Sequence, residues 1–455
     1  MQKDLIIIGA GPGGYTAALR AAELGAQVLL VEQDKVGGTC LHRGCIPTKA
    51  LYKNAEVMNT LQNAANFGVE LGGYALNMAR VQARKKEIVD RLHSGIHLLL
   101  KNQKVQFIQG QGRLIGPNRV RVTEESGNTL DIEARHILLA TGSKPSLPPI
   151  PGADLPGVIT SDEILDLEKV PERLVIIGGG VIGIEFACIF QAFGCQVTVL
   201  EFLPRILPLM DEEISKRLTP LLKKKGINIE TDVKVTEITR EGNTLTVLVE
   251  DKKANVRSHS AETVLIATGR VPNTAGLGLE EAGVEYGKQG IKVNDDYATS
   301  VPGIYAIGDV IGGQMLAHVA SHQGTTVVEN LYGSPRTDAG SVVPSCVFAF
   351  PEVASVGLTE QELKQQNIPY VVNKALFGAN GKALTLGEGE GFVKVLAHKE
   401  DKKILGVHIL GPHASDLIHE AALAVQKKVT AADIAAMIHA HPTLAESFHE
   451  AVLKL

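Results

Sequence analysis

The feature that most constrains the fold is a glycine-rich unit that occurs twice, with a constant offset of 169 residues, from Gly9 to Gly178. Each unit runs from a short apolar segment through a GxGxxG turn into a helix-like segment, and then into a second apolar segment that ends on an acid. Short apolar runs interrupted by a glycine-rich turn are typical of a buried strand–helix–strand unit. The two units span Leu5–Glu32 and Leu174–Glu201.

The residue types in this turn suit the binding of a dinucleotide. The first glycine permits a tight turn, the second lets the backbone approach a pyrophosphate, and the third lets the helix pack closely on the strand. The pyrophosphate lies at the helix N-terminus, where free N–H groups favour negative charge, and the acid accepts hydrogen bonds from ribose hydroxyls. A tight turn without a ligand is the alternative for one copy, but two complete copies predict two dinucleotide-binding domains in tandem. The residues are Gly9, Gly11, Gly14 and Glu32 in the first copy and Gly178, Gly180, Gly183 and Glu201 in the second.

Composition argues against several other classes of protein. The chain has 455 residues and a net charge of −5, whereas a nucleic-acid-binding surface requires a basic field. It has no Trp and 4% aromatic residues, which leaves few platforms for base stacking. No run of about 18 apolar residues suggests a membrane span. Asp4 and the glycines interrupt the apolar N-terminus, so we interpret it as a first strand and expect a cytoplasmic protein without nucleic-acid or membrane partners.

Directly after the first unit, Cys40 and Cys45 stand in the segment Gly37–Leu51. A loop of this length can close into a strained, reducible disulfide, and a helix N-terminus lowers the pKa of a thiol. The alternatives are two buried inert thiols, or half of a zinc site that includes His42, although the sequence has no second cysteine pair to complete such a site. Next to two dinucleotide sites, the pair favours redox chemistry. We interpret the other cysteines as small apolar packing residues: Cys188, Cys195 and Cys346.

A second group of reactive side chains lies near the C-terminus, from His439 to Glu446. An imidazole has the pKa of a general base at neutral pH, and a carboxylate behind it fixes its tautomer and stabilises its charged form. The segment therefore predicts that His441 is a base and that Glu446 orients it. A solvated histidine-rich surface and a metal-binding His-x-His pair are the alternatives, but no further ligand is fixed nearby, and we predict no metal site.

Taken together, these motifs resemble those of the pyridine nucleotide–disulfide oxidoreductase family over essentially the whole chain. The shared segments are the two fingerprints, GGTCxxxGCIPTKAL, two apolar segments that end in Ala-Thr-Gly, GxYAxGD and the C-terminal HAHPTLAE. The resemblance implies an α/β fold with two tandem Rossmann-like domains, for FAD and NAD, and a C-terminal α+β dimerisation domain. The expected boundaries are 1–148 for the FAD-binding domain with the redox disulfide, 149–271 for the NAD-binding domain, 272–342 for a central segment that completes the FAD site, and 343–455 for the dimerisation domain.

The resemblance also implies roles for single residues. The first fingerprint would bind the ADP half of FAD, and Asp309 and Ala317 would lie at the flavin side. Lys49 would reach the flavin and pair with Glu185, in the helix of the second fingerprint. One departure is Gln323, where the family often has Glu, which would change the local charge near the flavin. The remaining expected cofactor contacts come from the two Ala-Thr-Gly segments: Thr141, Gly142 and Gly269.

The implied activity is the oxidation of protein-bound dihydrolipoyl groups to lipoyl groups. Electrons would pass through a Cys40–Cys45 disulfide and FAD to NAD+, with Cys40 as the interchange thiol and Cys45 next to the flavin. In such enzymes the histidine base comes from the other subunit, so we expect a homodimer. Its expected partners are the lipoyl domains and acyltransferase core of a 2-oxo acid dehydrogenase complex. A related NAD(P)H-dependent disulfide or metal reductase is the alternative.

The acid of the second fingerprint indicates which nicotinamide cofactor is used. Glu201 would hydrogen-bond a free 2′-hydroxyl and repel a 2′-phosphate. Arg205, four residues later, could weaken this preference, but prolines flank it at 204 and 208. We therefore expect NAD rather than NADP.

Overall fold

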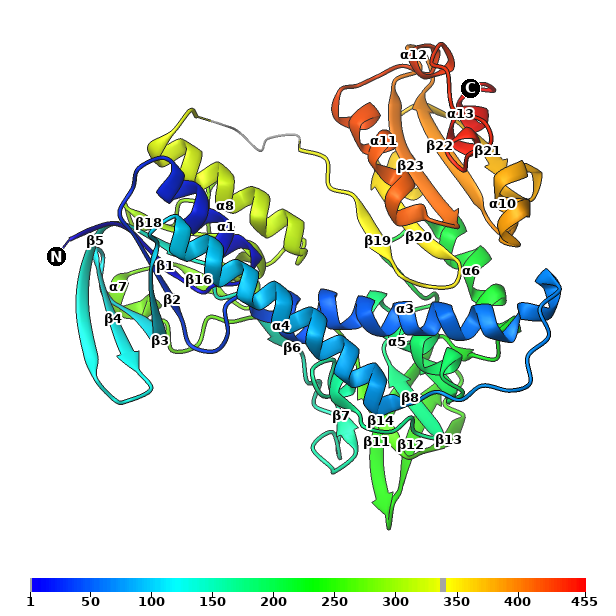
Figure 1. Ribbon diagram of the computed structural model, residues 1–455, viewed down its shortest axis with the longest axis horizontal. Coiled ribbons are helices and arrows are strands. Elements are labelled where there is room, and N and C mark those ends of the chain that lie inside the picture. The colour runs from blue at the N-terminus through cyan, green and yellow to red at the C-terminus, as the bar shows by residue number, and fades with distance from the viewer. Residues whose placement is uncertain (1, 336–340) are drawn as a thin grey trace.

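The computed structural model describes residues 2–335 and 341–455, which form three lobes (Figure 1). The N-terminal lobe lies on the left of the view, the second lobe below the centre and the C-terminal lobe at the upper right. Two long helices, α3 (Cys45–Gln62) and α4 (Met78–Asn102), pack side by side and run from the first lobe towards the second. Within the described ranges, no helix is both long enough and apolar enough to cross a membrane.

The N-terminal lobe is built on a parallel sheet in the order β3-β2-β1-β5-β18. Strand β1 is apolar on both faces because both faces are covered. Leu5 and Ile7 pack with helices α1 and α8, whereas Ile6 and Ile8 pack with the antiparallel β3-β4-β5 layer. The bounds are β1 (Lys3–Ile8), α1 (Pro12–Glu23), β2 (Val28–Glu32), β3 (Gln106–Gly116), β4 (Arg119–Glu124), β5 (Thr129–Leu139), β18 (Ile304–Ala306) and α8 (Ala317–Tyr332).

The second lobe repeats this arrangement on a parallel sheet in the order β10-β9-β8-β14-β7. Strand β8 lies between β9 and β14, just as β1 lies between β2 and β5. A three-stranded antiparallel sheet, β11-β12-β13, covers one face. The bounds are β7 (Val158–Ile159), β8 (Arg173–Ile177), α5 (Val181–Ala192), β9 (Gln196–Leu200), α6 (Glu212–Lys224), β10 (Asn228–Glu230), β11 (Val233–Glu241), β12 (Thr244–Asp251), β13 (Val256–Ala261) and β14 (Thr263–Ile266).

Short elements join the two lobes. The residues that follow the two Ala-Thr-Gly segments form β6 (Ser143–Pro145) and β15 (Arg270–Pro272), which pair with each other antiparallel. Helix α2 (Gly38–Arg43) leads from the first unit into α3.

Other short elements lie elsewhere in the chain. They are α7 (Leu279–Ala282), β16 (Tyr286–Gly287), β17 (Gly290–Ile291) and 3-10 turns at Ala64–Phe67, Glu163–Asp166, Gly308–Ile311 and Phe377–Ala379.

The C-terminal lobe is an antiparallel sheet in the order β19-β20-β23-β22-β21, with helices packed on it. The bounds are β19 (Ser345–Val347), β20 (Glu352–Gly357), α9 (Glu360–Gln365), β21 (Tyr370–Leu376), α10 (Gly381–Leu386), β22 (Phe392–His398), β23 (Ile404–Gly411), α11 (Ala414–Gln426), α12 (Ala431–Ala435) and α13 (Glu446–Val452).

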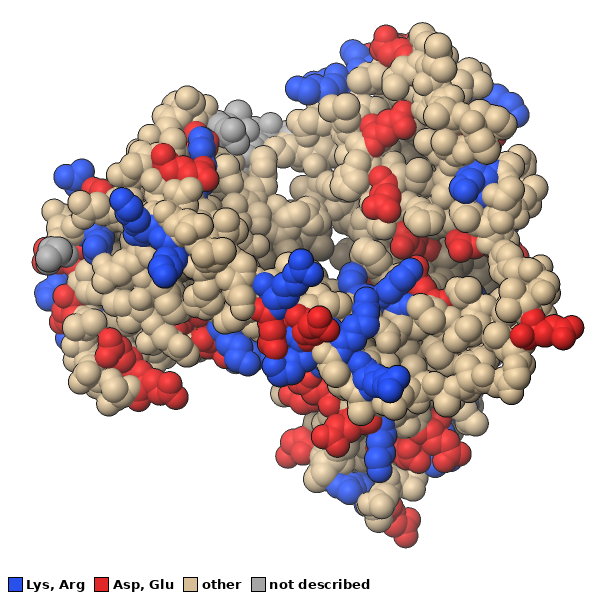
Figure 2. All heavy atoms as spheres, in the orientation of Figure 1, with Lys and Arg blue, Asp and Glu red and all other residues tan. Residues whose placement is uncertain are grey.

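The predicted fold class is confirmed, with two parallel α/β units in tandem and a C-terminal α+β domain. The central segment 272–342 returns to the first lobe, where β18 extends the sheet and α8 packs along α1. Part of that segment, 336–340, lies outside the described residues. On the face shown in Figure 2, Lys and Arg side chains are interspersed with Asp and Glu, and a hollow separates the N-terminal lobe from the C-terminal lobe.

Candidate active site

The two fingerprint turns share one backbone geometry. Gly9 and Gly178 have φ angles of +104° and +114°, a region that favours glycine. A Cβ at Gly14 would lie 1.9 Å from the Gly9 carbonyl oxygen, and a Cβ at Gly183 would lie 2.0 Å from the Gly178 carbonyl oxygen. The first and third glycines therefore bring helix and strand together at a distance that no other residue permits.

The middle glycines face open space instead. In the described part of the chain, an added Cβ at Gly11 or Gly180 would meet no atom within 4 Å. Each is the N-cap of a 12-residue helix, α1 or α5, and provides no capping side chain for the first N–H groups. These N–H groups therefore border a space that fits a pyrophosphate. Both turns meet the requirements of a dinucleotide cradle.

The acid at the end of each unit holds its own fingerprint turn. Glu32 accepts hydrogen bonds from two backbone N–H groups, at 2.8 and 2.9 Å. Glu201 does the same at 2.5 and 2.7 Å. One donor in each unit is the residue directly after the first glycine, Ala10 or Gly179. A carboxylate has about four acceptor positions, so both acids retain capacity for ribose hydroxyls.

The second unit opens onto a cavity of about 840 Å³. Ligand pockets typically measure roughly 300–1,000 Å³, so a nucleotide fits this volume. Four of the predicted cofactor contacts line the cavity: Gly178, Gly180, Glu201 and Gly269. Gly183 lies behind them in the turn, and Glu185 of the same helix is directed elsewhere, towards Lys49.

Residues from three separate segments meet near the first unit. Ser143 donates a hydrogen bond to Asp309 at 2.5 Å. Arg270 donates to the hydroxyl of Ser143 at 2.7 Å and to its carbonyl at 2.8 Å. Thr141 and Asn273 exchange hydrogen bonds at 2.8 and 3.2 Å. The residues that follow the two Ala-Thr-Gly segments thus fix the position of Asp309, Ser143 by direct contact and Arg270 through Ser143.

The start of α8 completes this region. Ala317 is the first residue of α8, which packs along α1. Gln323 of the same helix accepts a hydrogen bond from the N–H of Gly308 at 2.7 Å. A Glu side chain could accept the same bond, so the departure from the family pattern changes charge and preserves this contact. Gly142 and Gly269 have positive φ angles of 70° and 117°, and an added Cβ at either would meet no described atom within 4 Å.

The two predicted redox cysteines stand at adjoining helix ends. Cys40 lies in α2 and is half-buried, whereas Cys45 is the exposed first residue of α3. A Cβ at Gly44 would lie 3.0 Å from the Thr39 carbonyl oxygen and 3.3 Å from the Cys40 Cα, so glycine permits this close approach. Both cysteines are free thiols in this structure. Their disulfide stays a prediction for the oxidised protein.

The pKa values of the two thiols are displaced in opposite directions. The hydrogen bond between them, together with burial, raises the pKa of Cys40 above its usual range. The same hydrogen bond lowers the pKa of Cys45 to about 7, with partial desolvation by neighbouring atoms opposing it and the positive charge of Lys49 assisting. The N-terminus of α3 also favours a thiolate at this position. At neutral pH one sulfur therefore remains protonated while the other ionises readily.

Lys49 connects the cysteine helix to the rest of the molecule. Its Nζ lies 2.9 Å from Glu185 Oε2, and it lies over the Phe348 ring at 4.3 Å from the centroid. The N–H of Phe348 donates to Glu185 at 3.0 Å. The structure thus brings the predicted Lys49–Glu185 pair together. Phe348, between β19 and β20, contacts both of these side chains.

The C-terminal histidines face two different carboxylates. His441 Nδ1 lies 2.9 Å from Glu446 Oε1, and 78% of the His441 side chain is exposed. The N–H of Thr443 and the His441 ring hold the pKa of Glu446 below its usual range, so it stays ionised. His439 Nε2 lies 3.0 Å from Glu420. Throughout the parts of the chain that the structure describes, no three His, Cys, Asp or Glu side chains come together as a metal-binding group.

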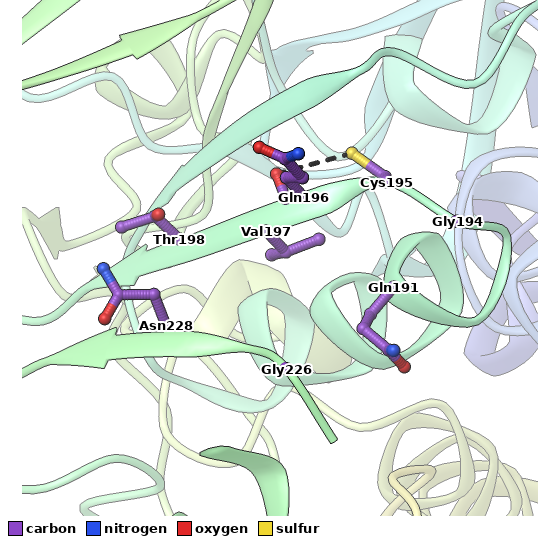
Figure 3. A pocket seen from close by; sticks show the side chains of 8 residues that line it. All are labelled: Gln191, Gly194, Cys195, Gln196, Val197, Thr198, Gly226 and Asn228. Carbon is purple, nitrogen blue, oxygen red and sulfur yellow. Dashed lines mark hydrogen bonds between the residues drawn. The ribbon is translucent and has the colours of Figure 1, made fainter. Parts of the chain in front are cut away.

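The other cysteines have the properties of packing residues. Burial raises the pKa of Cys188 and Cys195 to about 12 and that of Cys346 to about 11. Figure 3 shows Cys195 beside a surface hollow of about 430 Å³, with its sulfur directed towards the Gln196 carbonyl at 3.6 Å. Thiols with such pKa values are poor nucleophiles at neutral pH.

Sequence reasoning missed three residues of this site. Ser143 and Arg270 directly follow the two Ala-Thr-Gly segments, so their place after the repeat was a usable signal. Phe348 gave no local signal, because its contact with Glu185 joins residues 163 apart.

Comparison with known proteins identifies the class. Residues 3–324 match the family described as pyridine nucleotide-disulphide oxidoreductase, and residues 343–452 match the dimerisation domain of that family. The chain belongs to this family, as the sequence resemblance predicted.

Individual relatives narrow the class. The chain is 44% identical to the dihydrolipoyl dehydrogenase of Bacillus subtilis, over 99% of this chain and 98% of that protein. It is 41% identical to the dihydrolipoyl dehydrogenase of Chlamydia pneumoniae, over 99% and 96%. Among solved structures, it is similar to the Cu(II) complex of the HOCl-induced flavoprotein disulfide reductase RclA from Escherichia coli, with 28% identity, a TM-score of 0.90 and full coverage of both chains.

Proposed function

We propose that this protein oxidises dihydrolipoyl groups to lipoyl groups with NAD+ as the electron acceptor. The observation that carries the proposal is the pair of thiols at the adjoining ends of α2 and α3, next to the Lys49–Glu185 ion pair. Two dinucleotide cradles accompany this pair in the same chain. The identity of 44% with a dihydrolipoyl dehydrogenase over almost the full length of both proteins supports the same substrate.

The proton chemistry is assigned to His441. Its Nδ1 faces Glu446, so a proton from a dihydrolipoyl thiol would arrive at Nε2. The carboxylate stabilises the imidazolium that results, because opposite charges are held 2.9 Å apart. This transfer makes the substrate a thiolate, which is the nucleophilic form of sulfur.

The sulfur chemistry is assigned to Cys40 and Cys45. In the oxidised protein, the substrate thiolate attacks the Cys40 sulfur, the Cys40–Cys45 bond breaks, and Cys45 leaves as a thiolate. The second substrate thiol then displaces the Cys40 sulfur, which closes the lipoyl disulfide and leaves the protein as a dithiol. The electrons balance, because one disulfide is reduced while the other forms. The low pKa of Cys45 makes it a good leaving group.

The remaining residues are assigned to the cofactors. FAD, when bound, would accept the electron pair from the dithiol and deliver it to NAD+ as a hydride. The residues proposed to hold FAD are Gly9, Gly11, Gly14, Glu32, Lys49, Thr141, Gly142, Asp309 and Ala317. Those proposed to hold NAD are Gly178, Gly180, Gly183, Glu201 and Gly269, whereas Glu185 is proposed to hold Lys49 at the flavin. The corresponding domains are the four predicted ones, 1–148, 149–271, 272–342 and 343–455.

The working form is proposed to be a homodimer in which each His441 serves the cysteines of the other subunit. Residues 343–452 match a dimerisation domain. His441 is 78% exposed, so its ring is accessible to a second subunit. Ile438, beside this region, is 98% exposed. An apolar side chain in that position suits an interface.

The proposed setting is the cytoplasm, with the lipoyl domains and acyltransferase core of a 2-oxo acid dehydrogenase complex as partners. Two bacterial dihydrolipoyl dehydrogenases that match almost the whole chain support the proposed partners. Co-purification of the acyltransferase core with the tagged native protein tests it. Recovery of the homodimer alone under conditions that preserve such complexes would contradict it.

The activity is tested by comparing substrates at matched concentrations. With dihydrolipoamide as the thiol, we expect rapid reduction of NAD+ and little reduction of NADP+. With glutathione as the thiol, we expect little reduction of NAD+. Glutathione turnover at a similar rate would favour a general disulfide reductase, as the likeness to RclA allows.

The role of the base is tested with His441→Gln. We expect kcat with dihydrolipoamide to fall by roughly 10²–10⁴-fold, the usual contribution of a general base, while bound FAD is unchanged. The matched control is His398→Gln, which removes another histidine–carboxylate pair, His398–Asp401 at 3.0 Å. Near-normal turnover of the His441 variant would refute the base assignment.

A further inference from the structure

A buried lysine joins the second lobe to the C-terminal domain. Lys394 on β22 has 2% of its side chain exposed. Its Nζ lies 2.9 Å from Asp211 Oδ1, 2.6 Å from Glu360 Oε2 and 3.5 Å from Glu213 Oε2. Asp211 and Glu213 stand at the start of α6 in the second lobe, whereas Glu360 begins α9 in the C-terminal domain. The proposed thiol chemistry uses none of these groups.

Asp211 is held from several sides. It caps α6 by accepting the N–H of Glu213 at 3.0 Å, and its other oxygen accepts the N–H of Glu360 at 3.0 Å. Burial alone would raise the pKa of Asp211, but the His408 imidazole, the Glu360 N–H and the Lys394 ammonium hold it below its usual range. A buried charge is strongly unfavourable away from its partners, so the carboxylate is confined to this position.

Asp211 also ends the loop that forms one wall of the proposed NAD cavity. We call residues 202–210 the wall loop. Three of its residues line the cavity: Phe202, Leu203 and Pro208. The N–H of Leu207 donates to the carbonyl of Gly179 at 2.8 Å, inside the fingerprint turn itself. The wall loop is therefore tied to the cradle through Leu207 and, at its C-terminal end, to the buried lysine through Asp211.

A second tether acts at the same point. The side-chain N–H of Gln361 in α9 donates to the carbonyl of Met210 at 3.0 Å, and its oxygen accepts the N–H of Glu212 at 3.3 Å. Both tethers come from the C-terminal domain and both hold the end of the wall loop. Apolar residues of similar size often stabilise a protein as much as a buried ion pair does, so the gain in stability does not account for this cluster. Fixing the position of the wall loop accounts for it better.

We propose that Lys394 is a positioning residue for NAD binding, through which the C-terminal domain fixes the wall of the nucleotide cavity. This inference rests on the proposed assignment of the second cradle to NAD. It makes nucleotide affinity depend on a domain that lines no part of the described cavity.

The test uses the FAD-loaded protein and measures NADH binding directly by titration calorimetry. We expect Lys394→Met to weaken NADH binding at least tenfold. Retained FAD, and reduction of the cysteine pair by dihydrolipoamide, should stay within twofold of the native protein. Gln361→Ala buries no unpaired charge and should weaken NADH binding about threefold, which preserves the test if the Lys394 variant fails to fold. The matched control is Lys374→Met, because Lys374 pairs with Glu213 at 2.7 Å in the same cluster but is 39% exposed.

Three outcomes would overturn the proposal. Native NADH affinity in a folded Lys394 or Gln361 variant would show that the tethers do not position the wall loop. Parallel loss of FAD and of dithiol reduction would show a general structural role. A native protein that does not bind NADH would remove the basis of both the proposed function and the tethering proposal. In contrast, a native protein that binds NADH but rejects dihydrolipoamide would contradict only the proposed substrate and leave the tethering result valid.

Discussion

The two glycine-rich units share one backbone geometry but differ in what surrounds them. Later segments enclose the first unit: α8 packs along α1, and Thr16 contacts Ser321 across 305 residues. The second unit borders a cavity of about 840 Å³, and the loop 202–210 forms one wall of it. We infer that the same motif serves a permanently held nucleotide in the first lobe and an exchangeable one in the second. The cysteine pair follows the enclosed unit, where a resident cofactor would remain beside it.

The largest expected effect comes from the third glycine of each unit. Gly14→Ala places a Cβ 1.9 Å from a carbonyl oxygen, and Gly183→Ala places one at 2.0 Å. Forced contacts of this kind cost at least about 3 kcal/mol, the upper part of the overpacking range. We expect the Gly14 variant to lose FAD and melt early, and the Gly183 variant to retain FAD and lose NADH binding. Flavin absorbance and thermal melting measure both.

The control for these variants is Gly95→Ala, because Gly95 lies in α4 and an added Cβ would meet no described atom within 4 Å. It should melt at or above the native temperature, since alanine favours a helix. If the Gly14 and Gly183 variants behave like this control, the close packing described for the two turns is wrong.

The middle glycines should separate binding from folding. Gly11→Leu and Gly180→Leu fill the open side of each cradle and meet no described atom within 4 Å at Cβ. We expect native-like folding with a loss of nucleotide affinity of at least about tenfold, of FAD for the first and of NADH for the second, because the side chain blocks the pyrophosphate. Calorimetry with each nucleotide measures this. A nucleotide that binds equally well to its variant must lie elsewhere.

A smaller effect is expected from the acids. Glu201→Ala removes the acceptor for two backbone N–H groups of the fingerprint loop. NAD affinity should fall on the order of tenfold, the value of one hydrogen bond to a charged group, and the preference over NADP should shrink. The KM values for both nucleotides measure this. An unchanged NAD-to-NADP ratio would show that another residue selects the cofactor.

The smallest effect concerns the Cys45 thiol at the start of α3. The pKa of Cys45 is lowered to about 7 by its hydrogen bond with Cys40 and, to a lesser extent, by Lys49. Below that pH the sulfur is protonated and unreactive, and above it the sulfur is a thiolate. Lys49→Met removes a positive charge, so the pKa should rise and alkylation of the reduced protein at pH 7 should slow on the order of fivefold. Lys53→Met, at an exposed position of the same helix, should leave the pH profile unchanged. A profile that moves to lower pH in the Lys49 variant would contradict this electrostatic assignment.

The sequence predicted best what depends on neighbouring residues. The fingerprints, the acids and Cys40–Gly44–Cys45 are local patterns, because strand, turn and helix follow one another within 30 residues of chain, as from Leu5 to Glu32. The Ser143–Asp309 contact and the Lys394–Asp211 pair join residues 166 and 183 apart. Such contacts depend on how the lobes pack, and no periodicity or spacing encodes that packing.

The central claim is that one disulfide, Cys40–Cys45, is opened by the substrate and closed again by NAD+. To test it, the FAD-loaded protein is first oxidised in air and then transferred to oxygen-free buffer. It is alkylated there, and the labelled cysteines are mapped by mass spectrometry. Cys188, Cys195 and Cys346 serve as internal references, since burial raises the pKa of each. The account predicts that Cys40 and Cys45 are unlabelled at first, become labelled after dihydrolipoamide is added, and are protected again after NAD+ follows. Labelling that ignores dihydrolipoamide, or that NAD+ fails to reverse, would contradict it.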